Sequence, residues 1–426
     1  MKRPLQNSIW AIRDARIVLI ARAVSTAGTA VTSIAAILLL HNGLTGGGAD
    51  EGVAAMVVAA FLAALAIPTI ATMGVAGRVA DTMDSRLVLT VTALVQAAAV
   101  AALGFAPNTV MIFVTGVVIA VAQAFAQPTW SALVPRVVGE EHIGHAISWQ
   151  QGLTAVASPV GAAFGGILVT LDEVAWGFWA DAATYVVLAG AALLIRTRRH
   201  VEPAEDRPVG VPVPPADTSW TAGIRIVARD RILVPLFASI LVFVVLVEGI
   251  NPVEVFLVRD GLHASNWEYG LSEFFAGAGG LIGAAIAGRI VHNHRRARAA
   301  TVGFGLAAAV MVGAGLAPSF WIYAVLLTVM VAAFGTGNAT FGALMTSRTP
   351  DAQRGRVYAA LGGLARTASL IALALGGTAN ALIGPRATFV VAGIAGALTM
   401  AVAGLTVVRA QRAEASAAVS TATSDT

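Results

Sequence analysis

The chain has 426 residues, of which 57% are hydrophobic and only 12% carry a charge. A soluble domain carries about 25% charged residues, and a chain this apolar cannot cover its nonpolar surface by folding into a sphere. The composition therefore excludes an ordinary water-soluble protein and indicates one that folds in a lipid bilayer. The sequence contains no cysteine, which excludes disulfides, thiolate metal sites and thiol catalysis.

The chain opens with residues 1–16, which we interpret as a cytoplasmic tail, because the apolar stretch behind the basic opening is too long for a signal peptide. Twelve apolar stretches follow, each long enough to cross a bilayer as a helix. They lie near 17–40, 53–75, 87–106, 109–133, 146–171, 174–195, 232–257, 268–290, 299–317, 319–345, 357–383 and 387–408. The sequence therefore predicts an all-α membrane protein with six-helix bundles over 17–195 and 232–408.

Two segments outside these bundles are polar. Residues 196–231 are rich in proline and charge, which predicts a cytoplasmic linker between the bundles. Towards its end the stretch "TAGIRIVARDRI" alternates apolar and basic residues at near-helical spacing, which predicts an amphipathic helix on the membrane surface. Residues 409–426 are small and polar, so we expect a disordered cytoplasmic tail.

The distribution of basic residues predicts the orientation of the chain. With a cytoplasmic N-terminus, 23 of the 27 lysines and arginines fall on cytoplasmic segments, as the positive-inside rule requires. The net charge of +4 is therefore a topology signal rather than a sign of nucleic-acid binding. We expect a multi-pass protein of a bacterial-type inner membrane, monomeric, with the lipid bilayer as its partner and both termini cytoplasmic.

The two predicted bundles repeat each other. An ungapped comparison of 129–166 with 340–377, at an offset of 211, gives 11 identities in 38 positions, including both members of a Gly-Gly pair. Parallel six-helix halves of this kind are typical of transporters that rock around a central site.

The segment "GRVADTMDSR", residues 77–86, resembles the signature loop G-x-x-x-D-x-x-x-[RK]-[RK] of the major facilitator superfamily. The chain resembles that superfamily over nearly its whole length. The sequence departs from the loop pattern at Asp84, where glycine is usual, and at Thr82, where a basic residue is usual. The stretch "ASPVGAAFGG" resembles, in a loosened form, the fifth-helix motif G-P-x-x-G-G of the superfamily's exporters. Three further stretches, "ARAVSTAG", "WADAATYVV" and "RGRVYAALGG", resemble its drug:proton antiporter subgroup of enterobactin exporters and macrolide-efflux proteins. The resemblance implies a major facilitator fold of twelve transmembrane helices in two pseudo-symmetric bundles.

By the same resemblance, the signature loop closes the cytoplasmic side of the transporter. Asp81 would accept hydrogen bonds from basic residues at the ends of other spans. The expected gating residues are Gly77, Arg78, Asp81, Arg86, Arg136, Arg354 and Arg356. The alternative is an ordinary cytoplasmic turn whose charges only direct topology.

Charged residues inside predicted spans each cost about 2.5–3.5 kcal/mol on insertion scales, so each is a candidate functional residue. The candidates for a substrate or proton cavity are Arg22, Asp181, Glu248 and Arg366. Arg22 could instead extend to the cytoplasmic headgroups, Asp181 could form local hydrogen bonds, and Arg366 could form a static ion pair. Glu248 is a candidate for reversible protonation. We expect Glu254 and Glu273 nearer the external surface.

Small residues in the repeated segment predict helix faces that approach closely and pivot on each other. The expected pivot residues are Ser158, Pro159, Gly165, Gly166, Gly376 and Gly377. Pro159 should bend its helix. Static tight packing is the alternative.

No H-E-x-x-H motif, carboxylate cluster or P-loop occurs, so we expect no enzyme activity, no metal and no cofactor. The resemblance implies a secondary transporter that exports hydrophobic or amphiphilic small molecules, such as a drug, a macrolide-like compound or a siderophore, by alternating access. Protons are the default coupling ion, although the fourth span lacks the arginine expected of many proton-driven exporters. A carrier of lipids such as lysophospholipids and a non-transporting membrane receptor remain as alternatives.

Overall fold

The computed structural model describes residues 9–139, 142–196, 225, 230, 233–349 and 351–424. These residues form helices joined by short turns, and no strand occurs among them. Because a backbone in lipid must satisfy its own hydrogen bonds, this is the expected state of a chain built from long apolar stretches. The predicted all-helical fold is confirmed.

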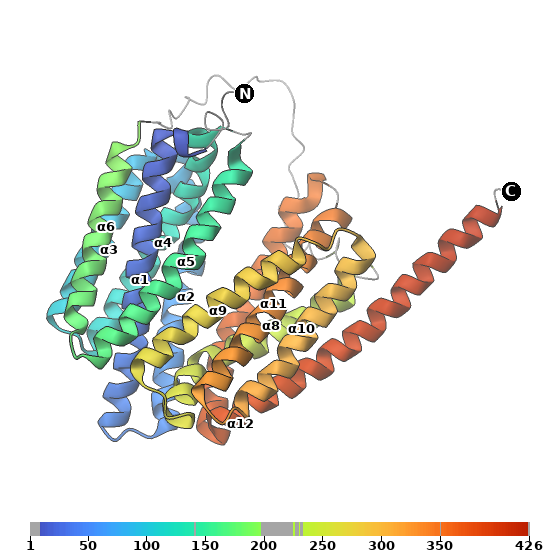
Figure 1. Ribbon diagram of the computed structural model, residues 1–426. Helices are drawn as coiled ribbons and strands as arrows, with labels where there is room; N and C mark the ends of the chain where they lie inside the picture. The colour runs from blue at the N-terminus through green and yellow to red at the C-terminus, as the bar shows by residue number, and fades with distance from the viewer. Residues whose placement is uncertain are drawn as a thin grey trace, which may run out of the picture. The chain divides into compact units, whose positions relative to one another are not determined.

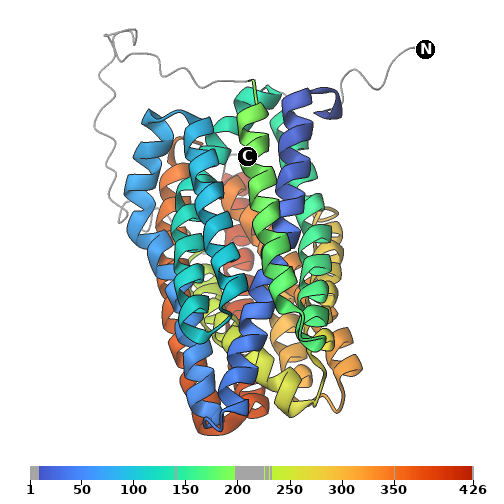
Figure 2. The same ribbon diagram turned by 90° about the vertical axis from the view of Figure 1, so that its left-hand side faces the viewer.

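The chain divides into two compact units. The first comprises Met1–Gly210 with Ala264–Phe274, and the second comprises Val211–His263 with Phe275–Thr426. The long helices of the first unit are α1 (Arg13–Gly46), α2 (Glu51–Thr82), α3 (Ser85–Phe105), α4 (Thr109–Val138), α5 (Ile143–Thr170) and α6 (Val174–Leu194). In Figure 2 the green α6 lies beside α1 and α3, with which it makes contact.

The helices of the second unit follow the predicted linker. They are α8 (Leu233–Phe256), η4 (Leu257–Gly261), most of α9 (Asn266–Ala287), α10 (Asn293–Gly315), α11 (Phe320–Arg348) and α12 (Asp351–Ser424). The first turns of α9, up to Phe274, belong to the first unit. The predicted linker with its amphipathic helix lies outside the described residues, except for Arg196, Arg225 and Asp230.

The last helix supplies two of the predicted spans. Gly384 interrupts it with φ of 76° and ψ of 168°, and Pro385 follows. Glycine takes a positive φ without steric cost, and proline cannot donate the next helical hydrogen bond, so this pair turns the chain. Figure 1 draws the two parts as separate rods, orange and red. With α12 counted as two, each of the twelve predicted spans falls on a helix.

The end of the chain differs from the prediction. The structure continues α12 to Ser424, across residues 409–424 where the sequence predicted a disordered tail. The segment "RAQRAEASAA" is rich in alanine, arginine, glutamine and glutamate, which have high helix propensity. Low hydrophobicity was the basis of the prediction, but it does not prevent continuation of a helix that is already formed.

Glycines of the repeat bring helices into close contact inside each unit. In the first unit α1 and α5 run side by side (Figure 1), and a Cβ on Gly165 would lie 2.7 Å from the Val31 carbonyl oxygen. In the second unit a Cβ on Gly376 would overlap the Gly249 carbonyl oxygen of α8. Gly165 and Gly376 are 211 positions apart, so the sequence repeat corresponds to one packing seam that occurs twice.

Candidate functional site

A cavity of about 470 Å³ lies inside the first unit. Residues from α1, α3, α4, α5, α6 and the start of α9 line it, and many of them are polar. The amides come from Gln96, Gln123, Gln127, Gln150 and Gln151, and the hydroxyls from Ser25, Thr26, Thr29, Ser33, Thr154, Ser158 and Tyr185. Polar side chains at membrane depth are costly unless they face a partner or water, so their convergence marks this cavity as the candidate site.

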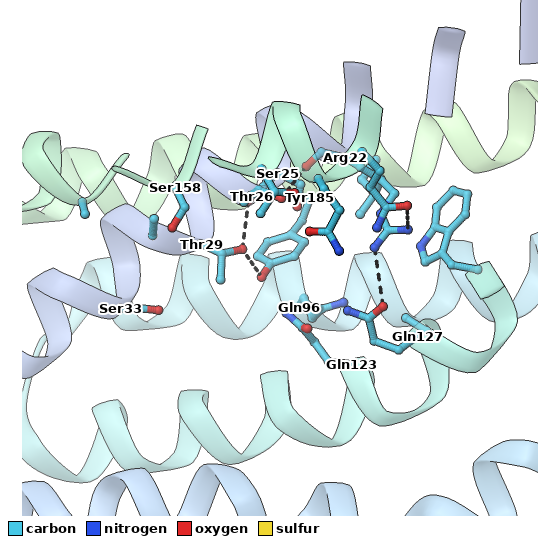
Figure 3. A pocket seen from close by; sticks show the side chains of 18 of the residues that line it. Arg22, Ser25, Thr26, Thr29, Ser33, Gln96, Gln123, Gln127, Ser158 and Tyr185 are labelled. Atoms are coloured by element: carbon cyan, nitrogen blue, oxygen red, sulfur yellow. Dashed lines mark hydrogen bonds between the residues drawn. The ribbon is translucent and has the colours of Figure 1, made fainter. Parts of the chain in front are cut away.

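One face of α1 lines the cavity along its length. Arg22, Thr26, Thr29 and Ser33 are spaced at three or four residues, which places them on a single helix face. Figure 3 shows them in a row, with Arg22 at one end and Ser33 at the other. At 1.5 Å per residue, this row is about 16 Å long.

Arg22 is half-buried and its guanidinium points into the cavity (Figure 3). Its Nη1 donates to Gln150 Oε1 at 3.3 Å, and its Nη2 donates to Gln127 Oε1 at 3.5 Å. The guanidinium carbon lies 5.3 Å from the centroid of the Trp130 ring, in a cation–π contact. Among the described residues it has no carboxylate partner. A positive charge held by neutral amides remains available to an anionic group.

Tyr185 of α6 lines the cavity beside α1. The Tyr185 and Thr29 hydroxyls are 2.8 Å apart, and Thr29 also donates to the Ser25 carbonyl oxygen at 2.9 Å. The Thr29–Tyr185 bond joins α1 to α6 and holds the phenol at the cavity surface (Figure 3).

Glu273 of α9 also lines the cavity. Two close contacts fix the position of α9 on α5: a Cβ on Gly166 would lie 2.5 Å from the Asn266 carbonyl oxygen, and one on Gly270 would lie 2.5 Å from that of Ala162. The two helices therefore run antiparallel, and Glu273 comes one turn after Gly270. Among the described residues, no hydrogen bond or ion pair involves its carboxylate.

Asp181 is buried between α6 and α1 and does not line the cavity. Its Oδ2 accepts from the Thr32 hydroxyl at 2.6 Å, and its Oδ1 accepts from the Thr184 hydroxyl at 3.1 Å. A Cβ on Gly28 would overlap the Asp181 carboxylate, so the two helices touch at this point. The bond with Thr184 is local to α6, as one alternative for this residue expected, whereas the bond with Thr32 joins α6 to α1.

Glu248 and Arg366 lie in the second unit. Glu248 is half-buried in α8 and accepts from Asn251 Nδ2 at 2.9 Å. Arg366 is exposed on α12, and no hydrogen bond or ion pair involves it among the described residues. The static ion pair considered for Arg366 is therefore absent from this part of the chain.

The residues of the expected gate lie at helix ends. Gly77, Arg78 and Asp81 are in the last turns of α2, Arg86 is in the first turn of α3, Arg136 is in the last turn of α4, and Arg354 and Arg356 begin α12. The side chains of Asp81, Arg354 and Arg356 lie outside the described part, so their predicted pairing stays a prediction. Asp84 accepts from the Arg86 backbone N–H at 2.8 Å and caps α3, which explains a carboxylate where the family pattern has glycine.

The expected pivot residues lie on or beside the packing seams. Ser158 lines the cavity, and the buried Pro159 lies within a continuous α5. Gly165 contacts α1, Gly166 contacts the start of α9, Gly376 contacts α8, and Gly377 is buried. Close approach is therefore observed, whereas pivoting stays a prediction.

Sequence reasoning did not single out the five glutamines, and Trp130, expected as an anchor at the membrane interface because it lies near a span end, is instead buried and lines the cavity. Uncharged amides are only moderately unfavourable in a span, so they are weaker signals than charges. Because α4 is almost uniformly apolar, its sequence does not indicate which of its faces lines the polar cavity. A signal was present in the spacing of Gln123 and Gln127, which lie four residues apart on one face of α4.

The family model and the sequence relative that match this chain indicate the same family. The family model described as Major Facilitator Superfamily matches residues 18–256 and 247–423. The chain is 25% identical over 336 residues to YfiS of Bacillus subtilis (strain 168), an uncharacterized MFS-type transporter, covering 77% of this chain and 79% of that protein.

Solved structures share the fold at low sequence identity. A bacterial homologue of the iron transporter ferroportin, in an inward-facing state, has a TM-score of 0.66 at 15% identity, over 93% of this chain and 98% of that chain. A POT family transporter in complex with 5-aminolevulinic acid has a TM-score of 0.67 at 13% identity, over 93% and 96% of the two chains. A bacterial homologue of the human lysosomal transporter Spinster, inward-facing and unoccupied, has a TM-score of 0.63 at 14% identity, over 94% and 97%.

Proposed function

Because the chain belongs to the Major Facilitator Superfamily and is a multi-pass membrane transporter, we propose that it exports amphiphilic small molecules through the cavity of its first unit. The observation that carries the proposal is the half-buried guanidinium of Arg22, which faces this cavity between two glutamine amides and the Trp130 ring. An unpaired charge at membrane depth is retained where it binds a cargo or a coupling ion.

The composition of the cavity wall favours an amphiphile. Amides and hydroxyls offer hydrogen bonds to polar groups, while Ile34, Trp130 and Leu188 offer apolar surface. A binding site with a few placed polar groups and apolar walls suits drug-sized molecules. The candidates remain a drug, a macrolide-like compound or a siderophore.

Alternating access is the proposed mechanism. In this mechanism the repeated glycine seams let helices of each unit slide while the cavity opens to one side and then to the other. The signature loop at the end of α2 would hold the cytoplasmic side closed, with Asp81 accepting from Arg136, Arg354 or Arg356. Since exposed ion pairs contribute about 0–1 kcal/mol, such a latch can bias two states without locking either.

Proton antiport is the proposed energy source, with both termini in the cytoplasm. Carboxylates that meet a cavity can take up and release protons, and Glu273 lines this one. Glu248 of the second unit is the other candidate. The fourth span contributes glutamines in place of the arginine expected of many proton-driven exporters, so the carboxylates would carry the coupling.

Transport into inverted membrane vesicles tests the proposal. Vesicles containing the full chain should accumulate an amphiphilic dye or a siderophore when a proton gradient is imposed, and stop when a protonophore collapses it. Arg22→Gln should reduce accumulation about tenfold or more, because the cavity loses its cation. The matched control is Arg289→Gln, which removes an exposed arginine after α9 and should leave transport unchanged.

Three results would contradict parts of the proposal. Absence of gradient-driven accumulation for every cargo would exclude proton-coupled export. Movement of lysophospholipid without a gradient would favour the lipid carrier. A phenotype that survives neutralisation of both Arg22 and Glu273 would favour a non-transporting receptor.

A further inference from the structure

Two opposite charges face the cavity of the first unit, and no other charged side chain among the described residues lines it. Arg22 contributes the positive charge from α1, and Glu273 contributes the negative charge from α9. In the described part of the chain, the Arg22 guanidinium contacts two amides and an aromatic ring, and no donor contacts Glu273. Each charge is therefore open to a ligand.

Arg22 and Glu273 form no ion pair in the described part of the chain. The Arg22 guanidinium contacts Gln150 of α5. Because α9 runs antiparallel to α5 and Gly270 lies against Ala162, Glu273 reaches the level of Ser158, which lines the same cavity. Eight residues of α5 separate that level from Gln150, which is about 12 Å at 1.5 Å per residue. An ion pair requires a separation of about 4 Å or less.

Between these charges the wall is neutral and hydrogen-bonding. Gln151, Thr154 and Ser158 follow one another along α5 at one-turn spacing, and Thr26 and Thr29 follow on α1. Amides and hydroxyls act as both donors and acceptors, so they can solvate a polar chain without preference for its charge. Charge recognition is therefore confined to the two ends.

On the basis of the transport function proposed above, we infer that the cargo is a zwitterion. Its carboxylate or phosphate binds Arg22 with Gln127 and Gln150, and its ammonium group binds Glu273, at a level about 12 Å further along α5. A neutral cargo leaves both protein charges unpaired, and a cargo of one sign leaves one of them unpaired. Only a molecule that carries both charges at this spacing satisfies the whole cavity.

Calorimetric titration of the purified full chain with four forms of one molecule tests the inference. The forms are 8-aminooctanoate, its N-acetyl derivative, its methyl ester and the doubly blocked compound. The zwitterion should bind about tenfold or more tightly than either singly blocked form, because each block removes one charge-assisted contact. A short homologue, 4-aminobutanoate, carries the same charges but spans about half the distance, and it should lose the advantage.

Two variants should change this preference in opposite ways. With Arg22→Gln the zwitterion and its methyl ester should bind equally, while blocking the amine still weakens binding. With Glu273→Gln the zwitterion and its N-acetyl derivative should bind equally, while blocking the acid still weakens binding. A misfolded variant cannot produce this reciprocal pattern. The control Glu173→Gln removes an exposed carboxylate before α6 and should preserve the wild-type order.

The inference is overturned if the doubly blocked compound binds as tightly as the zwitterion, if the zwitterion does not bind, or if both variants weaken all four forms equally. These results can be separated from failure of the proposed function. If a dye accumulates in vesicles when a gradient is imposed and the four forms bind with equal affinity, the proposed export function stands and the inferred zwitterionic cargo is rejected.

Discussion

Arg386 follows the turn at Gly384 and Pro385, and its guanidinium donates to three main-chain carbonyl oxygens. Nη2 donates to Gly261 at 2.7 Å, and Nη1 donates to Ala317 at 2.8 Å and Gly315 at 3.3 Å. These carbonyls belong to the ends of η4 and α10, which lack partners within their own helices. One side chain thus ties three segments of the second unit together.

Replacing Arg386 with alanine should lower stability, because three carbonyl groups lose a charged donor. Hydrogen bonds to charged groups contribute about 1.5–3 kcal/mol each, so the melting temperature in detergent should fall by about 5–10 °C. Arg366→Ala is the matched control, since that exposed arginine of the same helix has no partner among the described residues. Equal melting temperatures for Arg386→Ala and wild type would show that the three bonds do not contribute.

At the site, the sequence identified charges more readily than their surroundings. Arg22 could be singled out because a charge in a span is costly wherever it points. Whether its side chain extends to the headgroups or into the cavity could not be decided from the sequence. The helix α1 is apolar around most of its circumference, so its hydrophobic pattern does not indicate which face lines the cavity. Glu273 was expected nearer the external surface from its position early in its span, but depth alone did not reveal that it lines the cavity, where the contact of Gly270 with α5 places it.

Among the helices, the seam glycines differ from other glycines of the same repeat. A Cβ on Gly165 or Gly376 would meet a backbone carbonyl oxygen of the neighbouring helix. A Cβ on Gly152 or Gly363, at equivalent positions of the same two segments, would meet nothing within 4 Å. Glycines that are identical in the two halves therefore include some that pack against a neighbouring helix and some that do not. The sequence alone does not distinguish these two kinds.

Alanine substitution should separate these two kinds of glycine. Gly165→Ala and Gly376→Ala should each lower the melting temperature by several degrees, because neighbouring backbones must move apart against a close-packed interior. Gly152→Ala and Gly363→Ala should leave it unchanged or raise it slightly, since alanine favours a helix by about 0.5–1 kcal/mol. Size-exclusion profiles and melting curves of the four variants give the comparison. A fall of equal size in all four would contradict the seam.

The helices themselves could be predicted well because an apolar stretch of about 20 residues has only one satisfactory backbone state in lipid. Their ends could not, since a helix continues past the hydrocarbon wherever propensity and capping allow. Asp84 starts α3 as its N-cap, and α12 runs on to Ser424 through residues of high helix propensity. Hydropathy indicates which residues lie in the hydrocarbon region. The helix ends lie outside that region, where capping and helix propensity determine them.

At the scale of the whole molecule, the repeat links sequence to architecture. The offset of 211 that relates two stretches of sequence also relates the contact of α5 with α1 to that of α12 with α8. Membership of the Major Facilitator Superfamily agrees with this arrangement. The polar cavity described above is lined by residues of the first unit.

The most direct test of alternating access uses the absence of cysteine from the chain. Gln151→Cys and Ser33→Cys place single thiols on exposed residues that line opposite ends of the cavity. In sealed membranes, a membrane-impermeant maleimide should label Gln151→Cys from the cytoplasmic side and Ser33→Cys from the outer side. A transported dye should raise one labelling rate while lowering the other. Labelling of both thiols from one side only, at rates that neither the dye nor a proton gradient changes, would contradict the account.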